Sequence, residues 1–303
     1  MPLILNNTND DDNTTNTDPI ILPENYQKIF LKAKQKVETF YSHHRHHIQT
    51  SHGWIHISAV LDHTEKALSS LLRSSSSLLS NNSNCIPSTK VMLDIKLAAL
   101  LHDLDDKKYF PNTKGTFPNA DGVLQSLGIS SSIECESDSY HRIMKMISWV
   151  GCSENGNVVP AEIQESNEYY LLIPRWADRL EAVGSRGVVR CFQYNQERGL
   201  PLSSAASPRP QGEEELWTRY VCSRNLDDYM KRGGTSTDMI SHYYDKLLHI
   251  SRPPANIVRN RYLEQMAASS TKCLVEVCIR YGRTGVVDQD YINSLACCSK
   301  DDK

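Results

Sequence analysis

The chain has 303 residues, which is enough for one large domain or two small ones with a full hydrophobic core. A net charge of −3 and a pI of about 6.4 argue against binding to nucleic-acid duplexes or membrane surfaces through overall charge. No apolar run has the length of a membrane span, and the first residues lack the basic region of a signal peptide. The nine cysteines form no C-x-x-C pair, which favours free thiols. We therefore expect a soluble cytoplasmic protein.

The amino-terminal third predicts helices separated by polar segments. Residues 1–22, rich in Asn, Thr and Asp, predict a disordered segment. Apolar residues at helical spacing predict a helix from residue 23 to about 40, a second from 54 to about 72, and a third from about 91 to 104. Ser- and Asn-rich residues 74–88 predict a flexible insertion, and residues 111–122 predict a loop.

The rest of the chain continues this pattern. Further helices are predicted at 140–150, 175–193, 213–232, 238–249 and 256–279. Residues 199–212 contain three prolines and two glycines and predict a loop that could serve as a lid. No alternating strand pattern is sustained. The sequence therefore predicts an all-α bundle, with one domain over residues 23–270 and a helix end and tail over residues 271–303.

The most informative motif is His102-Asp103, which ends an apolar helical segment. A neutral imidazole beside a carboxylate suits Mn²⁺, Fe²⁺, Mg²⁺ or Zn²⁺. Asp106 and Lys108 follow, and a lysine at this distance suits a phosphate group. The motif therefore points to a metal-dependent phosphohydrolase, provided that further ligands lie on other helices.

Three other places offer polar groups on apolar helix faces. His56 shares a helical stripe with Val60, so it is expected to point inward. Asp178 lies among Ala, Leu and Val, where an unpaired carboxylate would be costly. His242 and Lys246 lie one turn apart on one face. Each has an ordinary explanation when taken alone, as a core histidine or a solvated charge. Together with His102 and Asp103, however, His56 and Asp178 form a set of ligands for a hard metal on three helices of a bundle.

This set resembles the HD superfamily of metal-dependent phosphohydrolases, whose pattern is His … His-Asp … Asp. The closest likeness is to small HD proteins with the motifs H-D-W-x-H-I, L-L-H-D-x-x-D-x-K-[FY], D-A-D-R-L-D-A-x-G-x-x-G-x-x-R and H-[FY]-[FY]-[DE]-K-L-L. These match residues 52–57, 100–109, 176–190 and 242–248. The resemblance covers about Glu24 to Met266. It implies an HD-domain bundle that hydrolyses phosphate ester or anhydride bonds.

The resemblance also implies roles for individual residues. The implied metal ligands are His56, His102, Asp103 and Asp178, with Asp103 and Asp106 as catalytic carboxylates. The implied substrate-binding residues are Lys108, Arg179, His242 and Lys246, and the residues that support the ligands from outside are His52 and Glu181. The implied cofactor is a divalent metal, Mn²⁺ first, with Mg²⁺, Fe²⁺, Zn²⁺ or Co²⁺ as alternatives.

The chain departs from the family pattern at several points. Trp176 replaces an Asp and Glu181 replaces another, and the His pair that relatives often carry is missing around residues 148–150. Its absence counts against a two-metal site, for which His141 is the only candidate extra ligand. A small-molecule phosphate is the expected substrate, with a nucleotide favoured.

Several alternatives stay open at this point. The activity can be that of a monophosphatase or of a nucleoside triphosphate pyrophosphohydrolase. The alternatives of another class are an HD-fold di-iron oxygenase and a non-catalytic ligand-binding or regulatory HD protein. The sequence does not indicate an oligomeric state.

Overall fold

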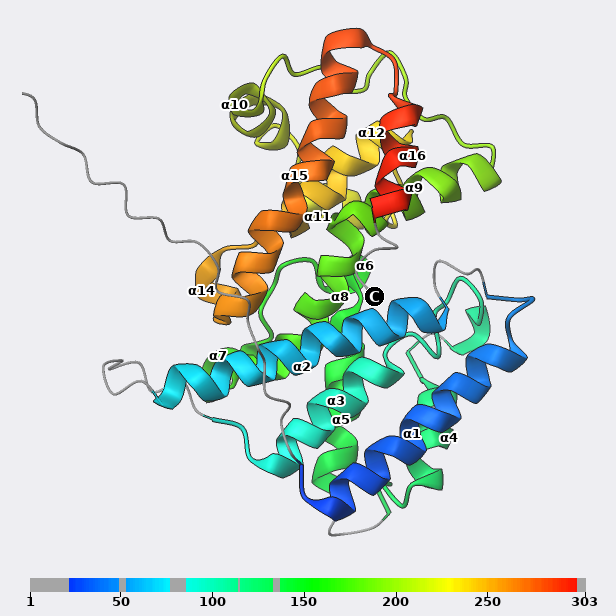
Figure 1. Ribbon diagram of the computed structural model, residues 1–303, viewed down its shortest axis with the longest axis vertical. Coiled ribbons are helices and arrows are strands. Elements are labelled where there is room, and N and C mark those ends of the chain that lie inside the picture. The colour runs from blue at the N-terminus through cyan, green and yellow to red at the C-terminus, as the bar shows by residue number, and fades with distance from the viewer. Residues whose placement is uncertain (1–21, 49–52, 77–85, 114, 133–136, 299–303) are drawn as a thin grey trace, which may run out of the picture.

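The computed structural model describes residues 22–48, 53–76, 86–113, 115–132 and 137–298. Every regular element in these ranges is helical, which confirms the predicted all-α class (Figure 1). The α-helices are α1 (Glu24–His43), α2 (Trp54–Ser76), α3 (Thr89–Leu101), α4 (Pro118–Ser126), α5 (Ser137–Val150), α6 (Cys152–Asn155), α7 (Ala161–Ser166), α8 (Ile173–Val183), α9 (Ser185–Glu197), α10 (Glu213–Glu215), α11 (Leu226–Lys231), α12 (Met239–His242), α13 (Leu248–Ser251), α14 (Ala255–Val258), α15 (Arg261–Thr284) and α16 (Gln289–Cys298). None of them combines the length and apolar character that crossing a membrane requires.

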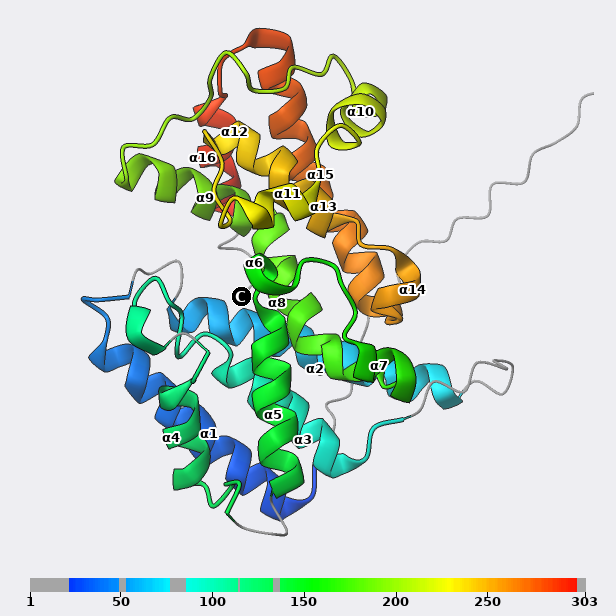
Figure 2. The same ribbon diagram turned by 180° about the vertical axis from the view of Figure 1, so that it is seen from behind.

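The amino-terminal helices form a first core around α3. All residues of α3 from Met92 to Leu101 are buried, because α1, α2, α5 and α8 surround it. A helix that is apolar on all sides is stable only in such a central position. Its first turn is capped by Ser88, whose Oγ accepts the N–H of Val91 at 3.4 Å. Figures 1 and 2 show this group of helices in the lower half of the molecule.

A second core lies in the upper half of Figure 1, among α9, α11, α12, α13, the later turns of α15, and α16. Two helices contribute to both cores. In α8, Trp176 packs in the first core and Val183 in the second. In α15, Leu263 packs in the first core and Leu274 in the second. The two cores therefore meet along α8 and α15.

The helix predicted at 175–193 is broken in the middle. Gly184 has an extended backbone (φ −79°, ψ −172°) and separates α8 from α9. Gly187 then lies against the preceding helix so closely that a Cβ built there would lie 2.0 Å from the carbonyl oxygen of Ala182. Only glycine permits this approach. The tight corner turns α9 away from the axis of α8.

Residues 118–126 form α4, although residues 111–122 were predicted to be a loop. Pro118 occupies the first turn, where proline is favoured. The carboxylate of Asp105 accepts the backbone N–H groups of Asn119 at 3.1 Å and Ala120 at 3.0 Å. This acceptor comes from the turn after α3. It satisfies the unpaired N–H groups at the start of α4 through a tertiary contact, which local sequence patterns do not reveal.

The carboxy-terminal predictions were correct in helical content and partly wrong in continuity. The segment predicted at 213–232 is divided at residues 222–225, after a π-helical turn at Leu216–Val221, whereas the one predicted at 238–249 is a continuous helical run over residues 239–251 with a π-helical turn at Tyr243–Leu247. The helix predicted at 256–279 becomes α14 and α15, since Asn260 caps Leu263 with its side chain. The predicted boundary at residue 270 falls inside α15, and α16 occupies part of the predicted tail. Most of residues 1–22 and of the 74–88 insertion lie outside the described residues.

Candidate metal centre

The four predicted metal ligands come together from three packed helices. His56 lies in the first turn of α2, and His102 follows the last residue of α3. Asp103 lies in the turn after α3, and Asp178 lies in the middle of α8. Since α2, α3 and α8 pack against one another, these side chains face a common point in the first core.

The imidazole nitrogens and the carboxylate oxygens are close to one another. His56 Nε2 lies 3.4 Å from Asp103 Oδ2 and 3.3 Å from Asp178 Oδ1. His102 Nε2 lies 3.6 Å from Asp103 Oδ1 and 3.7 Å from Asp178 Oδ1. The ligand atoms of His56, His102 and Asp103 all lie within 4.8 Å of one another, so this group could hold a metal ion.

His102 has a free nitrogen directed at this point. Its Nδ1 lies 2.9 Å from the carbonyl oxygen of Ala99, which can only accept, so Nδ1 carries the hydrogen. Its Nε2 is buried and has no hydrogen-bond partner among the described residues. An unsatisfied buried nitrogen facing two carboxylates is costly, and a divalent cation would satisfy all three groups. The nitrogen and oxygen donors present therefore fit a borderline or hard metal.

The titration of these groups reflects their mutual attraction. Burial disfavours the charged form of His102, but Asp103 and Asp178 outweigh it and raise its pKa to about 9. Burial also opposes the ionisation of Asp178 and Asp103, yet the two imidazoles hold the pKa of both carboxyls well below the ordinary value. Without a metal, the site is held together by imidazole-to-carboxylate pairs.

Asp106 and Lys108 lie just beyond the His-Asp pair. Asp106 Oδ1 accepts the backbone N–H of Lys108 at 2.9 Å, and the Lys108 ammonium lies 3.6 Å from Asp106 Oδ2. Burial, followed by the charge of Asp103, raises the pKa of Asp106 in spite of Lys108. The side chain of Lys108 is half exposed, so it can reach solvent or a ligand.

His242 and Lys246 come from the second core, at the end of α12 and in the following π-helical turn. Burial, then the charges of Lys246 and Lys108, lower the pKa of His242 to about 3. The influence of Lys108 on this imidazole shows that the two halves of the molecule approach each other here. His242 is therefore neutral at pH 7. Lys246 has no carboxylate within ion-pairing distance among the described residues.

The guanidinium of Arg179 has its hydrogen-bond partners outside the metal group. Its guanidinium donates to Asn157 Oδ1 at 2.5 Å and to the carbonyl oxygen of Gly156, and lies 4.5 Å from the ring centre of Trp176. The side chain is 2% exposed. Arg179 thus ties α8 to the segment after α6, a placement different from the substrate contact that the resemblance implies. Trp176, the departure from the family motif, supplies the surface on which Arg179 packs.

Of the two supporting residues, only Glu181 is described, because His52 lies outside the described residues. Glu181 Oε1 lies 3.3 Å from Nε2 of His63, and the Nδ1 of His63 lies 2.7 Å from the hydroxyl of Tyr262. Glu181 therefore orders the next inward histidine of α2 rather than contacting a member of the metal group. The sequence carries a signal for the inward position of His63, because it follows His56 by seven residues, about two helical turns, and so lies on the same face of α2.

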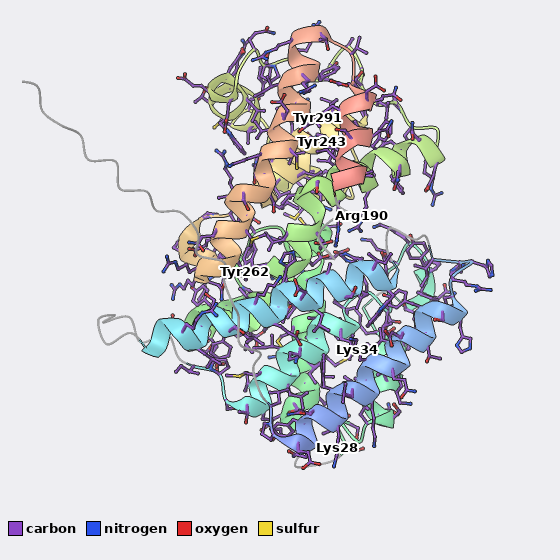
Figure 3. The ribbon with its side chains drawn as sticks, viewed as in Figure 1. Lys28, Lys34, Arg190, Tyr243, Tyr262 and Tyr291 are labelled. Carbon is purple, nitrogen blue, oxygen red and sulfur yellow. The ribbon has the colours of Figure 1, made fainter. Side chains whose placement is uncertain are left out.

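Arg190 was given no role from the sequence, although it ends the third motif. It lies on α9, and its Nη1 is 3.2 Å from His56 Nδ1. Figure 3 labels it between the upper helices and α2. The two residues are 134 positions apart, so only the turn at Gly184 and Gly187 brings them together.

The proline-containing loop at 199–212 is anchored at several points. Asp238, the N-cap of α12, accepts hydrogen bonds from Ser204 and Ser207 at 2.9 Å each. The backbone N–H of Met239 donates to the carbonyl oxygen of Pro201 at 3.1 Å. The hydroxyl of Tyr281 donates to the carbonyl oxygen of Ser204 at 3.3 Å. These contacts fasten the loop to the second core in this structure.

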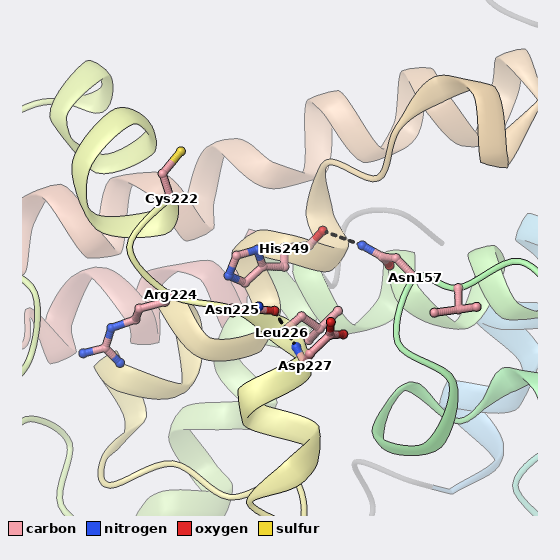
Figure 4. A pocket seen from close by; sticks show the side chains of 8 residues that line it. Asn157, Cys222, Arg224, Asn225, Leu226, Asp227 and His249 are labelled. Atoms are coloured by element: carbon pink, nitrogen blue, oxygen red, sulfur yellow. Dashed lines mark hydrogen bonds between the residues drawn. The ribbon is translucent and has the colours of Figure 1, made fainter.

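A separate pocket lies on the side of α11 and α13, and none of the predicted site residues lines it. Figure 4 shows Arg224, Asp227 and His249 along its wall. The side chain of Asn157 donates to the carbonyl oxygen of His249 at 3.3 Å and accepts from Arg179 on its other atom. The pocket therefore adjoins the structural contact of Arg179 rather than the metal group.

The comparisons with known proteins identify one related sequence of clear similarity. The uncharacterized protein L803 of Acanthamoeba polyphaga mimivirus is 35% identical over 195 residues, which cover 62% of this chain and 76% of the viral protein. The chain belongs to the same family as this viral protein. No protein-family model matches the chain.

Solved structures show the fold. A crystal structure from Lactobacillus plantarum has a TM-score of 0.51 at 18% identity, covering 86% of this chain and 97% of that one, so the two proteins share their fold. YpgQ of Bacillus subtilis, solved in complex with ADP, has a TM-score of 0.49 at 16% identity, with 88% and 99% covered. Lin1889 of Listeria innocua has a TM-score of 0.45 at 18% identity, with 89% and 95% covered.

Proposed function

We propose that this protein is a metal-dependent phosphohydrolase of the HD superfamily, acting on a phosphate ester or phosphoanhydride of a small molecule, with a nucleotide as the favoured substrate. The observation that carries the proposal is the buried Nε2 of His102, which has no hydrogen-bond partner in the described part of the chain and faces Asp103 and Asp178. The sequence resemblance to HD hydrolases supports it independently. Mn²⁺ is the favoured metal.

His56, His102, Asp103 and Asp178 would hold the cation. A divalent cation in this position would lower the pKa of a bound water and draw charge from a phosphoryl oxygen. Of the two candidate bases, Asp106 is the better proton acceptor, because its pKa is raised whereas that of Asp103 is lowered. Asp103 faces both imidazoles and would chiefly position the metal.

The cations around the site would bind the phosphate. Lys108 and Lys246 are the proposed ligands of non-bridging oxygens, where fixed positive charge stabilises developing negative charge. His242, neutral at pH 7, would act as a hydrogen-bond donor rather than as the acid that protonates the leaving oxygen. More than one cation facing one site favours a substrate with several phosphoryl groups.

The protein is proposed to act in the cytoplasm. The five cysteines whose side chains the structure describes are free thiols, as expected in a reducing compartment. They are Cys152, Cys191, Cys222, Cys273 and Cys278. No specific contact in the structure favours the oxygenase or the regulatory alternative.

The test is hydrolysis of a panel of nucleoside mono- and triphosphates in the presence of Mn²⁺, with release of phosphate and of pyrophosphate measured separately. Asp103→Ala is the blank. Phosphate from a monophosphate would identify a monophosphatase, and pyrophosphate from a triphosphate would identify a pyrophosphohydrolase. Equal release by the wild type and Asp103→Ala, or no release from any compound while Mn²⁺ is bound, would contradict a nucleotide phosphohydrolase at this site.

A further inference from the structure

The two histidines of the metal group have opposite environments at Nδ1, the ring nitrogen that does not face the carboxylates of Asp103 and Asp178. His102 Nδ1 lies 2.9 Å from a carbonyl oxygen, that of Ala99, which accepts a hydrogen. His56 Nδ1 lies 3.2 Å from Nη1 of Arg190, a group that can only donate. His56 is 5% exposed, so water does not compete freely for this contact.

This contact with a donor indicates which nitrogen of His56 carries a hydrogen. A guanidinium can donate to Nδ1 only when that nitrogen is bare, which leaves the hydrogen on Nε2. There it faces Asp178 Oδ1 at 3.3 Å and Asp103 Oδ2 at 3.4 Å. A histidine that binds a metal through Nε2 has its hydrogen on Nδ1 and donates it to an acceptor. Arg190 offers no acceptor, so His102 is arranged for metal binding and His56 is not.

We propose that Arg190 is a phosphate-binding residue that is held by His56 in the metal-free site and released when His56 binds the metal. The released guanidinium would then bind phosphoryl oxygens of the substrate. This inference rests on the proposed phosphohydrolase function and adds a residue to its substrate site.

The surroundings of Arg190 fit a highly charged anion. No carboxylate of the described residues lies within ion-pairing distance of its guanidinium. Lys246 faces the same region, since both cations act on the neighbouring thiol of Cys191, although burial raises the pKa of that thiol to about 12. Two cations that have no carboxylate partner in the described part of the chain suit the adjacent phosphoryl groups of a diphosphate or triphosphate.

The proposal predicts that metal and substrate favour each other's binding. Without substrate, Arg190 lowers the affinity for the metal. Metal binding breaks the contact of Arg190 with His56 and leaves the Nδ1–H of His56 facing the N–H of the guanidinium. A bound phosphate gives Arg190 a new partner and removes that cost. By linkage, the metal must raise the affinity for the anion by the same factor.

Arg190→Gln tests this directly, because the glutamine carbonyl can accept the Nδ1 hydrogen that Arg190 cannot. Calorimetric titration of the metal-free full-length protein with Mn²⁺ should show about three- to tenfold tighter binding in Arg190→Gln than in the wild type. Arg190→Met removes the same charge without supplying an acceptor and should fall between them. Inorganic pyrophosphate, titrated into the Mn²⁺-loaded protein, should bind at least tenfold more weakly to both variants.

Arg186→Gln is the matched control, since Arg186 lies on the same helix and pairs with Glu181 at 3.6 Å. It should leave both affinities within about twofold of the wild type. A nitrogen-15 imidazole spectrum should place the His56 hydrogen on Nε2 in the metal-free wild type. Unchanged Mn²⁺ and pyrophosphate affinities in Arg190→Gln, or a hydrogen on Nδ1 in the metal-free wild type, would overturn the proposal.

These outcomes separate the two proposals. If the wild type binds Mn²⁺ in a manner that depends on His102, while Arg190→Gln behaves like the wild type, only the role of Arg190 is wrong. If the wild type binds no divalent metal, or His102→Ala binds it equally well, the proposed function is itself wrong.

Discussion

Nδ1 of His102 donates to the carbonyl oxygen of Ala99 at 2.9 Å, within the last turn of α3. The helix that places this histidine also selects which of its nitrogens is free. Nε2 is thereby aimed at Asp103 and Asp178 without any contribution from a distant side chain. The centre of the proposed metal site is thus set by local helix geometry.

Removal of His102 should abolish the stabilisation that a metal provides. At a Mn²⁺ concentration about 100 times the dissociation constant, the wild type should gain about 2.7 kcal/mol in unfolding free energy. His102→Ala should gain almost nothing, because it removes a ligand that joins two helices of the site. Thermal unfolding with and without Mn²⁺ measures this. His141→Ala, which changes an exposed histidine on α5, is the control and should respond as the wild type does. A normal response of His102→Ala would place the metal elsewhere.

Asp94 should give the protein a pH dependence unrelated to the metal site. It is 1% exposed, and burial raises its pKa to about 6 in spite of Arg142 and Ser139. The folded state therefore binds this proton more tightly than the unfolded state. The resulting stability is complete below pH 3.8 and is lost as the pH rises through about 6, by about 3 kcal/mol in all.

The comparison of the wild type with Asp94→Asn isolates this contribution. Urea unfolding at several pH values between 4 and 7 should show that the stability of the wild type relative to Asp94→Asn falls with rising pH. Parallel profiles for the two proteins would show that Asp94 has an ordinary pKa in the folded state.

Arg179→Met should destabilise the protein rather than weaken substrate binding alone. The buried guanidinium makes two charge-assisted hydrogen bonds, to Gly156 and Asn157, and packs on Trp176. Hydrogen bonds of this kind contribute about 1.5 to 3 kcal/mol each, so we expect a loss of at least about 2 kcal/mol in urea unfolding. Lys28→Met, which removes an exposed ion pair with Glu24, should cost less than about 1 kcal/mol. If Arg179→Met has unchanged stability and a higher KM, Arg179 is a substrate-binding residue, as the resemblance implies.

Asp238→Ala should loosen the proline-containing loop. The carboxylate of Asp238 caps α12 and accepts from Ser204 and Ser207. Loss of a cap costs about 0.5 to 2 kcal/mol, and the loop would lose its anchors at Ser204 and Ser207 at the same time. Hydrogen exchange of residues 203–207 should be faster in this variant. Asp228→Ala, at an exposed position, should not alter it. Unchanged exchange in Asp238→Ala would mean that the other contacts of the loop hold it without Asp238.

The sequence was sufficient for features that depend on neighbouring residues. The apolar spacing predicted α1, α2 and α5 within a few residues, and it predicted that His56 and Asp178 point inward. The continuous helix predicted at 175–193 was wrong because Gly184 and Gly187 allow a corner that depends on contact with Ala182. The helix α4 was missed because its N-terminal acceptor, Asp105, lies in a different element.

Only the tertiary structure decided what surrounds each polar group. The resemblance implies that Arg179 binds substrate, and this stays a prediction, but only the packing of α8 on the segment after α6 shows that its guanidinium hydrogen-bonds to Asn157 and Gly156. The resemblance implies that His242 binds substrate, and only the structure shows that burial beside two lysines keeps this imidazole neutral. The contact of His56 with Arg190 joins residues 134 positions apart. Helix periodicity specifies the face on which a side chain lies, whereas the partner and the pKa depend on elements that the chain brings together only when it folds.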